Sequence, residues 1–350
     1  MSYTLNRKIK ELTPYEPISG TYNIRLDANE CPDTLPPEIQ QQIAEAMQKI
    51  SYNRYPDPLA TKLVNSFAEF YNIKPEWVTA GNGSDELIFL IESAFLEKGD
   101  RMLVVSPDFS MYQFYSSICE VECDTFFKDD SFKIDVDALL KKIKDDNIKL
   151  LLFSNPCNPT GGGITAEQAR KLVNGTDALV ILDEAYMDFW DESLIEETAD
   201  HDNLIIFRTA SKAIGCAALR LGFAVANPVI SRAIKAVKSP YNVNSISQAV
   251  GEVVYKNKEY LHKRKITIVK SREKLYNELS AIAAEQSDMT VYPSVANFVF
   301  VKTPDAAVIW EYLKQQSIVV RLMGTYLRIT AGTEYEVEQT VGAIKQFYKR

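Results

Sequence analysis

The segment "NLIIFRTASKAIGCAALRLGFAVAN", residues 203–227, contains two short apolar runs, 203–211 and 221–227, that predict buried strands. The loop between them is built from small and apolar residues, yet it contains Lys212 and Arg220. A lysine and an arginine in apolar surroundings cost free energy to desolvate unless each has a partner. The loop therefore predicts an anionic or electrophilic group that both side chains face.

Short apolar runs of the same kind recur along the chain and alternate with amphipathic helical patterns. The further runs, which predict strands, are "RMLVVSP" (101–107), "IKLLLFSNP" (148–156) and "ALVILDEAY" (178–186). The helical patterns lie at 85–99, 135–146 and 165–175. This alternation is typical of an α/β protein whose mostly parallel sheet is flanked by helices.

After about residue 256 the sequence changes character. A long charged helical stretch is followed by short strand-like segments and a last helical pattern. These segments cover 255–286, 289–303, 317–323, 326–332 and 334–349. A long helix followed by a few strands and a further helix predicts a smaller α+β domain.

The composition excludes several classes of function. The 350 residues carry a net charge of −8, which argues against nucleic acid and anionic membranes as partners. The N-terminus has no apolar core and predicts no signal peptide, and no run reaches the roughly 18 apolar residues of a membrane helix. Five scattered cysteines predict unpaired thiols in a reducing cytoplasm, and two histidines support neither a metal site nor a Ser-His-Asp triad.

Polar residues follow the ends of the predicted strands, where ligands bind in open parallel sheets. Asn158 lies in a loop rich in proline and glycine, and Asp183 ends a strand with Tyr186 three residues on. Ser211 and Lys212 follow the next strand. Each alone has an ordinary explanation as a turn former, a strand-end carboxylate or a solvated lysine. The ordered set at successive strand ends predicts a binding site.

A glycine-containing turn, "AGNGSDELIFL" (80–90), places Ser84 directly before a predicted helix. Free backbone N–H groups and the helix dipole there favour an anion such as phosphate. A plain turn with Ser84 as the N-cap is the ordinary alternative. The run lacks the third glycine of a dinucleotide-binding loop, so it gives little support to a nicotinamide site.

The ordered set resembles the fold-type I pyridoxal-phosphate (PLP) aminotransferases, and within them the histidinol-phosphate aminotransferase branch. The matching pieces run nearly end to end: "LTPYEP" (12–17), "LDANECP" (26–32), "YNRYPDP" (52–58), "GNGSDELI" (81–88), "SPDFSMY" (106–112), "NPCNPTGG" (155–162), "ILDEAYMDF" (181–189), "TASKAIG" (209–215), "LRLGF" (219–223) and "YLRITAGT" (326–333). The resemblance implies PLP as the cofactor.

The resemblance also implies how the chain is divided. Residues 1–45 are expected to form an N-terminal arm and a segment that completes the small domain. Residues 46–255 are expected to form the large PLP-binding domain, and residues 256–350 the C-terminal small domain.

By the same resemblance, Lys212 forms a Schiff base with the PLP aldehyde, which removes its ammonium charge. Arg220 pairs with the PLP phosphate, together with Ser211 and the backbone N–H groups of Ser84 and Asp85. Arginine's planar fork suits phosphate. The PLP aldehyde and phosphate are thus the electrophilic and anionic groups that Lys212 and Arg220 are expected to face.

The cofactor ring has its own expected partners. PLP withdraws electrons only if its pyridine nitrogen stays protonated, which a nearby carboxylate favours, and the resemblance gives that role to Asp183. Asn158 and Tyr186 are expected to hydrogen-bond the ring hydroxyl oxygen. Phe109 matches the aromatic residue that stacks on the ring, with simple core packing as its alternative.

The resemblance assigns substrate binding to residues outside the large sheet. Arg328 matches the arginine that holds the substrate anion, and Arg321 is placed to help it. Tyr15 matches a tyrosine of the substrate pocket. Tyr55 and Tyr241 match tyrosines that a neighbouring subunit supplies, so a homodimer with shared active sites is expected.

Several activities stay open on the sequence alone. Transfer of an amino group from histidinol phosphate to 2-oxoglutarate is the expected reaction. A PLP-dependent threonine-phosphate decarboxylase and an aromatic amino acid aminotransferase share nearly all the cofactor residues. A catalytically idle regulator of the same fold is a further alternative, against which the intact Lys212 and Arg328 argue.

Overall fold

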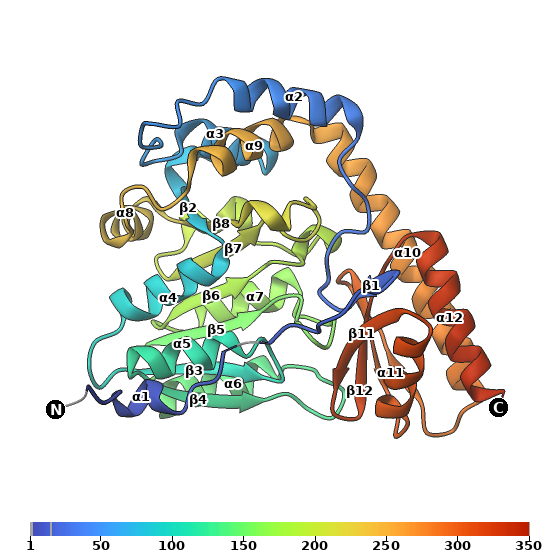
Figure 1. The fold of residues 1–350 in the computed structure, drawn as a ribbon. Helices are drawn as coiled ribbons and strands as arrows, with labels where there is room; N and C mark the ends of the chain where they lie inside the picture. The colour runs from blue at the N-terminus through green and yellow to red at the C-terminus, as the bar shows by residue number, and fades with distance from the viewer. Residues whose placement is uncertain (1–2, 15, 350) are drawn as a thin grey trace.

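The computed structural model describes residues 3–14 and 16–349. Its larger sheet has seven strands in the order β2-β8-β7-β6-β5-β3-β4 (Figure 1). The strands are β2 (Val78–Asn82), β3 (Arg101–Ser106), β4 (Glu122–Phe127), β5 (Leu150–Ser154), β6 (Leu179–Asp183), β7 (Leu204–Thr209) and β8 (Leu221–Ala226). Neighbouring strands are parallel except where β8 runs antiparallel to β2 and β7. The prediction of an α/β fold with a mostly parallel sheet is confirmed.

The smaller sheet has five strands in the order β1-β11-β12-β10-β9. They are β1 (Ile24–Leu26), β9 (Thr290–Tyr292), β10 (Phe298–Lys302), β11 (Ile318–Met323) and β12 (Tyr326–Thr330). Strand β1 pairs parallel with β11, and the other pairs are antiparallel. A segment from the start of the chain thus joins the sheet formed by its last third. The exact domain boundaries at 45/46 and 255/256 stay a prediction.

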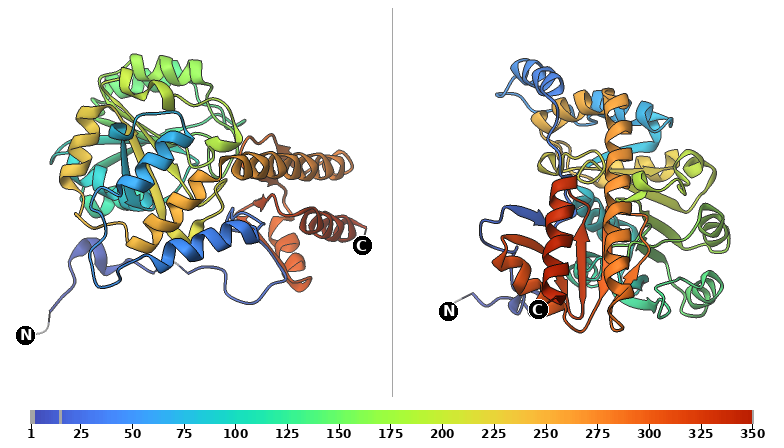
Figure 2. Two further views of the ribbon diagram at one scale, coloured as in Figure 1. Left: turned by 90° about the horizontal axis from the view of Figure 1, so that it is seen from above. Right: turned by 90° about the vertical axis from the view of Figure 1, so that its right-hand side faces the viewer.

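Helices cover both faces of the larger sheet and one face of the smaller sheet (Figures 1 and 2). They are α1 (Arg7–Lys10), α2 (Pro37–Gln48), α3 (Thr61–Phe70), α4 (Ser84–Phe95), α5 (Met111–Cys119), α6 (Val136–Asp145), α7 (Ala166–Asn174), α8 (Pro228–Val237), α9 (Ser245–Lys256), α10 (Lys258–Ala284), α11 (Ala306–Gln315) and α12 (Glu334–Tyr348). The long helix α10 and the last helix α12 run side by side behind the smaller sheet (Figure 2). None of the helices in the described residues is long and apolar enough to cross a membrane.

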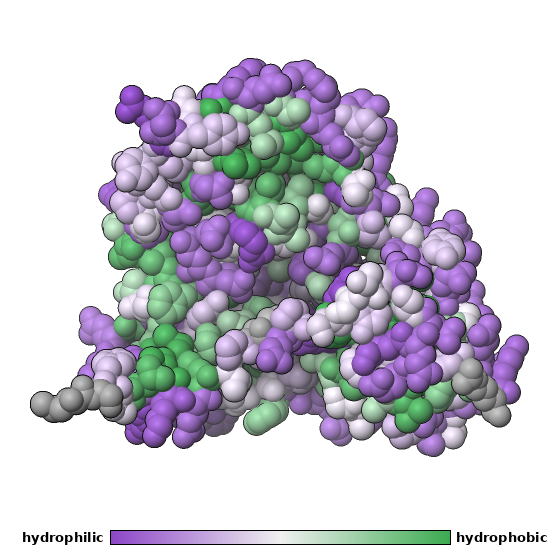
Figure 3. Space-filling model, viewed as in Figure 1, coloured by the Kyte–Doolittle hydropathy of each residue, from purple (hydrophilic) through white to green (hydrophobic). Residues whose placement is uncertain are grey.

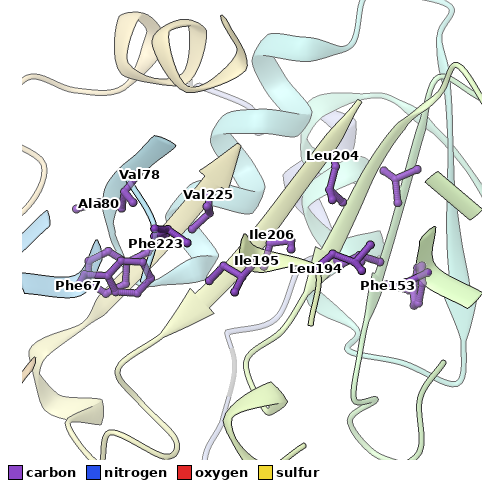
Figure 4. Packing of buried hydrophobic residues seen from close by; sticks show 14 of the residues in the cluster. Phe67, Val78, Ala80, Phe153, Leu194, Ile195, Leu204, Ile206, Phe223 and Val225 are labelled. Carbon is purple, nitrogen blue, oxygen red and sulfur yellow. The ribbon is translucent and has the colours of Figure 1, made fainter. Parts of the chain in front are cut away.

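The central strands of the larger sheet are buried on both faces, which explains their continuous apolar runs. On one face Phe67 of α3 stacks on Phe223 of β8, with ring centroids 3.9 Å apart (Figure 4). Tyr255 of α9 meets both rings nearly edge-on. This aromatic contact fixes α3 and α9 against the antiparallel strand.

The smaller sheet divides its residues by face. Val299 of β10 and Leu327 of β12 pack into the core with α10, α11 and α12. Side chains alternate along a strand, so Phe300 and Arg328 point from the opposite face. That face is turned away from α10, α11 and α12, and Arg328 on it contacts Asn158 of the larger-sheet part.

The carboxylate of Glu92 is buried with no counter-charge from the described residues around it. Glu92 of α4 is 0 % exposed, and neither of its carboxylate oxygens has a hydrogen-bond partner among the described residues. Burial and the charge of Glu92 both raise the pKa of the nearby Tyr115, Cys119 and Cys123, and none of these three side chains is cationic. Burial raises the pKa of Glu92 from 4.5 to about 8.

We expect Glu92→Gln to stabilise the protein increasingly as the pH rises. The pKa of Glu92 is higher in the folded than in the unfolded chain, so its contribution is present below about pH 4.5 and is lost as the pH rises toward 8. Glutamine has the same shape and no charge. Thermal unfolding from pH 5 to pH 9 should show the melting temperature of the variant above that of the wild type at pH 8, with a smaller gap at pH 5. A gap that does not change with pH would contradict this titration.

Candidate active site

The reversed direction of β8 brings the predicted site residues to one edge of the larger sheet. In the register, Gly222 of β8 lies opposite both Gly81 of β2 and Thr209 of β7. Because β2 and β7 end at this edge and β8 begins there, Arg220 stands beside the residues that follow β2 and β7. Asp183 ends β6 at the same edge.

Lys212 lies just after β7 and reaches toward the N-terminal segment. Its Nζ donates to the carbonyl oxygen of Ala28 at 3.0 Å and lies 5.8 Å from the centroid of the Tyr186 ring. The Tyr186 hydroxyl accepts from Asn29 Nδ2 at 2.9 Å. The predicted lysine and tyrosine are therefore neighbours, and residues 28–29 lie against both.

The turn between β2 and α4 forms a cradle for an anion. A Cβ on Gly83 would lie 2.8 Å from Arg220 Nη2, and a Cβ on Gly222 would clash with the backbone of Gly83 and Ser84. Arg220 Nη2 also donates to Asp85 Oδ2 at 3.2 Å. The first N–H groups of α4 and the Arg220 guanidinium thus lie together, as a phosphate group requires.

Asp183 is buried beside this cradle without a cationic partner. It is 4 % exposed, its Oδ2 accepts from the Tyr112 hydroxyl at 2.8 Å, and its Oδ1 accepts from the Ala185 N–H at 3.1 Å. No lysine or arginine among the described residues forms an ion pair with it. Burial raises the pKa of Asp183 to about 6, against the lowering effect of the Tyr112 hydrogen bond. A protonated ring nitrogen is the kind of group that would compensate this carboxylate.

Close to Asp183 and Lys212, a buried cluster of three charged side chains links the end of β6 to β7. Arg208 Nη2 lies 2.7 Å from Glu184 Oε2, and Arg208 Nη1 lies 3.0 Å from Asp188 Oδ1. The cluster joins the residue after Asp183 to a residue of the strand that precedes Lys212. It restrains the two strand ends that carry the site.

Residues of the two sheets meet at Asn158. Its Oδ1 accepts a hydrogen bond from Arg328 Nη1, while Arg328 Nη2 donates to the Asp27 carbonyl at 2.6 Å. Phe109 packs edge-on against Tyr112, with ring centroids 5.6 Å apart, which places it next to the Asp183 partner. The structure therefore brings Asn158 and Phe109 into the same region as the lysine and the carboxylate.

Arg321 and Arg328 lie directly opposite each other on β11 and β12. A tight turn with Gly324 at φ +64° joins the two strands, and this turn sets the register. Directly opposed residues of an antiparallel pair lie on the same face of the sheet. Two guanidinium groups so placed are chemically suited to an anionic ligand.

The remaining predicted residues take different positions. Ser211 is buried, and its hydroxyl oxygen accepts from Thr209 Oγ1 at 3.0 Å. Tyr55 and Tyr241 are 81 % and 46 % exposed and stack on each other with ring centroids 4.5 Å apart. Tyr15 lies outside the described residues.

Asn29 and Tyr112 are among the residues that contact predicted site residues but were not themselves predicted. Asn29 is buried at φ +54°, donates to Tyr186, and receives a hydrogen bond from Asn297 Nδ2 at its carbonyl oxygen. Tyr112 holds Asp183. Both lie inside quoted motifs, "LDANECP" and "SPDFSMY", so the signal that could have found them was their place in those motifs.

The molecular surface is hollowed between the parts built on the two sheets, on the face drawn in Figure 3. The two parts are also in direct contact, since Arg328 of β12 donates to Asn158 in the loop after β5. The arrangement can hold a phosphorylated, positively charged ring next to a lysine amine and bind a second anion at the arginine pair.

Comparison with known proteins agrees with this arrangement. The family model described as "Aminotransferase class I and II" matches residues 22–344. The chain is 38% identical to a histidinol-phosphate aminotransferase of Clostridium novyi over 97% of this chain and 96% of that protein. It is 40% identical to one of Thermoanaerobacter pseudethanolicus over 91% of this chain and 89% of that protein.

Solved structures show the same fold. The crystal structure of a histidinol-phosphate aminotransferase from Sinorhizobium meliloti, in complex with pyridoxal-5'-phosphate, covers 99% of this chain and 97% of its own, with a TM-score of 0.86 and 22% identity. The family match and the full-length relatives confirm the family predicted from the sequence motifs. The chain belongs to the class I and II aminotransferase family.

Proposed function

We propose that the protein is a PLP-dependent aminotransferase that moves the amino group of histidinol phosphate to 2-oxoglutarate. The observation that carries the proposal is the convergence of Lys212, the uncompensated Asp183 and the anion cradle at one sheet edge, with an arginine pair on the adjoining sheet. The curated relatives described above bear the name of this activity. Cytoplasmic location is part of the proposal.

The residues present fit PLP. Arg220, Ser211 and the N-terminus of α4 would hold the phosphate, and Asp183 would hold the ring nitrogen in its protonated form. Asn158 and Tyr186 would bind the ring hydroxyl oxygen, with Phe109 against the ring face. When bound, PLP supplies an electron sink that makes the proton on the substrate α-carbon acidic.

Lys212 is the proposed catalytic residue. Its amine would hold the cofactor covalently and, once displaced by the amine of the substrate, would move the proton at the substrate α-carbon. The Ala28 carbonyl, 3.0 Å from Nζ, gives the free amine a hydrogen-bond partner. This lysine makes a catalytic histidine unnecessary.

Arg321 and Arg328 are the proposed substrate-anion residues, with Tyr15 as a further predicted contact. Histidinol phosphate carries a phosphate in place of a carboxylate, whereas glutamate carries two carboxylates. Arginine forms paired hydrogen bonds with either group. Two opposed arginines can therefore serve both half-reactions.

A homodimer is proposed because exposed aromatic and aliphatic side chains gather near Tyr55. Hydrogen bonds and the stacking of Tyr55 on Tyr241 join two segments, 52–59 and 238–248, whose exposed residues include Tyr52, Tyr55, Leu59, Tyr241 and Ile246. Exposed apolar patches of this kind mark interaction surfaces. Tyr55 and Tyr241 would then complete the site of the neighbouring subunit.

The substrate assay tests the function. Purified protein given histidinol phosphate and 2-oxoglutarate should form glutamate. Lys212→Ala should abolish this activity and change the visible absorbance of the purified protein, and an unchanged absorbance would contradict the lysine assignment. Release of carbon dioxide from threonine phosphate would favour the decarboxylase instead. Glutamate formed only from aromatic amino acids would favour the third activity.

The glycine cradle gives a second prediction. A methyl group on Gly222 pushes against the backbone of Gly83 and Ser84, so Gly222→Ala should weaken PLP binding about tenfold or more, as expected for overpacking. Gly342→Ala is the matched control, because no atom lies within 4 Å of its added Cβ and alanine favours a helix. PLP titrations followed by visible absorbance should separate the two variants. Equal PLP affinities would contradict the cradle.

Shared sites predict complementation between subunits. Tyr55→Ala and Lys212→Ala should each be inactive alone. Mixed under conditions of subunit exchange, they should regain partial activity, because each hybrid dimer has one site with both residues intact. No recovery despite demonstrated exchange would show that Tyr55 does not serve the neighbouring site.

A further inference from the structure

One aromatic residue from the larger-sheet part of the molecule is held in a strained turn beside the smaller sheet. Phe132, in the loop between β4 and α6, has φ +62°, a left-handed conformation that bulky residues rarely adopt. Asp129 closes the turn: its Oδ1 accepts from the N–H groups of Ser131 at 2.9 Å and Lys133 at 2.8 Å, and its carbonyl accepts from the Phe132 N–H at 2.9 Å. Such strain persists only where surrounding contacts compensate for it.

The compensating contacts come from the smaller sheet. The Phe132 ring centroid lies 4.9 Å from that of Tyr292, 5.9 Å from that of Phe300 and 6.1 Å from that of Tyr326. Phe300 and Tyr326 are themselves stacked, 4.7 Å apart and almost parallel. We call Tyr292, Phe300 and Tyr326 the aromatic box. It joins β9, β10 and β12, and Phe132 packs against all three of its rings.

The aromatic box is continuous with the substrate-anion arginine. Phe300 is the cross-strand partner of Arg328, and Tyr326 precedes Arg328 by two residues on the same face of β12. A shift of the box relative to Phe132 therefore shifts Arg328 relative to the larger sheet.

A second contact fixes the same face at another point. The Val295 N–H donates to the Gly161 carbonyl at 2.8 Å, and Gly161 packs closely on Ser294. Gly161 follows the loop that carries Asn158. The Phe132 contact and the Gly161 contact therefore meet the smaller-sheet part at two separate points.

We infer that Phe132 is a positioning residue: by packing into the aromatic box, it sets the distance at which Arg328 meets the substrate anion beside Asn158. This inference rests on the proposed function, which makes Arg328 an anion-binding residue. The ring contacts of Phe132 are with Tyr292, Phe300 and Tyr326, and none of these three residues belongs to the proposed cofactor site. The effect of Phe132 passes through Phe300 and Tyr326.

The test measures binding of succinate, an unreactive dicarboxylate, to the PLP-loaded protein by thermal shift and visible absorbance. Phe132→Ala and Phe132→Gly should each raise the Kd for succinate about tenfold, the scale of losing aromatic pair contacts, with PLP affinity unchanged. Phe132→Tyr, which keeps the ring, should stay within about twofold of the wild type. The glycine variant should be at least as stable as the alanine variant, because glycine adopts positive φ without strain.

Matched variants separate the possible failures. Asn147→Gly changes another left-handed residue, φ +51°, on an exposed turn after α6 and should leave the succinate Kd unchanged. Arg328→Gln should abolish succinate binding. If Arg328→Gln loses succinate binding and Phe132→Gly binds succinate as tightly as the wild type, the positioning role of Phe132 is overturned and the role of Arg328 stands. If neither variant loses succinate affinity, both the anion-binding role of Arg328 and the positioning role of Phe132 are overturned.

Discussion

The proposed cofactor site depends on one constraint of strand direction. A parallel sheet delivers the carboxyl ends of its strands to one edge, but Arg220 precedes its strand and does not follow it. Because β8 is reversed, its beginning reaches the edge where β2 and β7 end. The absence of side chains at Gly83 and Gly222 then allows the turn before α4 to close on β8. A parallel β8 would place Arg220 at the opposite edge, far from Lys212.

The buried acidic residues near this edge differ in whether a cation pairs with them. Arg208 lies within hydrogen-bonding distance of Glu184 and Asp188, although burial still raises the pKa of Glu184. Among the described residues, Asp183 accepts hydrogen bonds from neutral donors only. Burying an unpaired carboxylate is costly. The two adjacent acidic residues therefore differ: Glu184 is part of an ion cluster that links two strands, and Asp183 is the proposed partner of a cationic ring nitrogen.

The sequence predicted the parts of the fold whose burial leaves a pattern. Strands β5, β6, β7 and β8 are buried on both faces and read as continuous apolar runs. Strand β4 lies at the sheet edge with mostly half-buried residues, and β1 has three residues, so neither leaves such a run. The same distinction holds for the site. Asp183 ends a predicted strand, Lys212 follows one and Arg220 directly precedes one. Asn29, in contrast, meets Tyr186 across 157 positions, and Phe132 meets the aromatic box through tertiary packing that no local pattern reports.

The pairing of β1 with β11 has a consequence for biosynthesis. Ile24 aligns with Ile318, so a strand that is synthesised before the larger sheet pairs with one that is synthesised after it. The larger sheet, whose strands lie between residues 78 and 226, can assemble while translation continues. The N-terminal segment must stay unpaired throughout that time, and closure of so long a loop is slow. Because residues 28–29 in this segment contact Lys212 and Tyr186, a nascent chain can contain both residues of the proposed site and still lack the segment that lies against them until β11 has been synthesised.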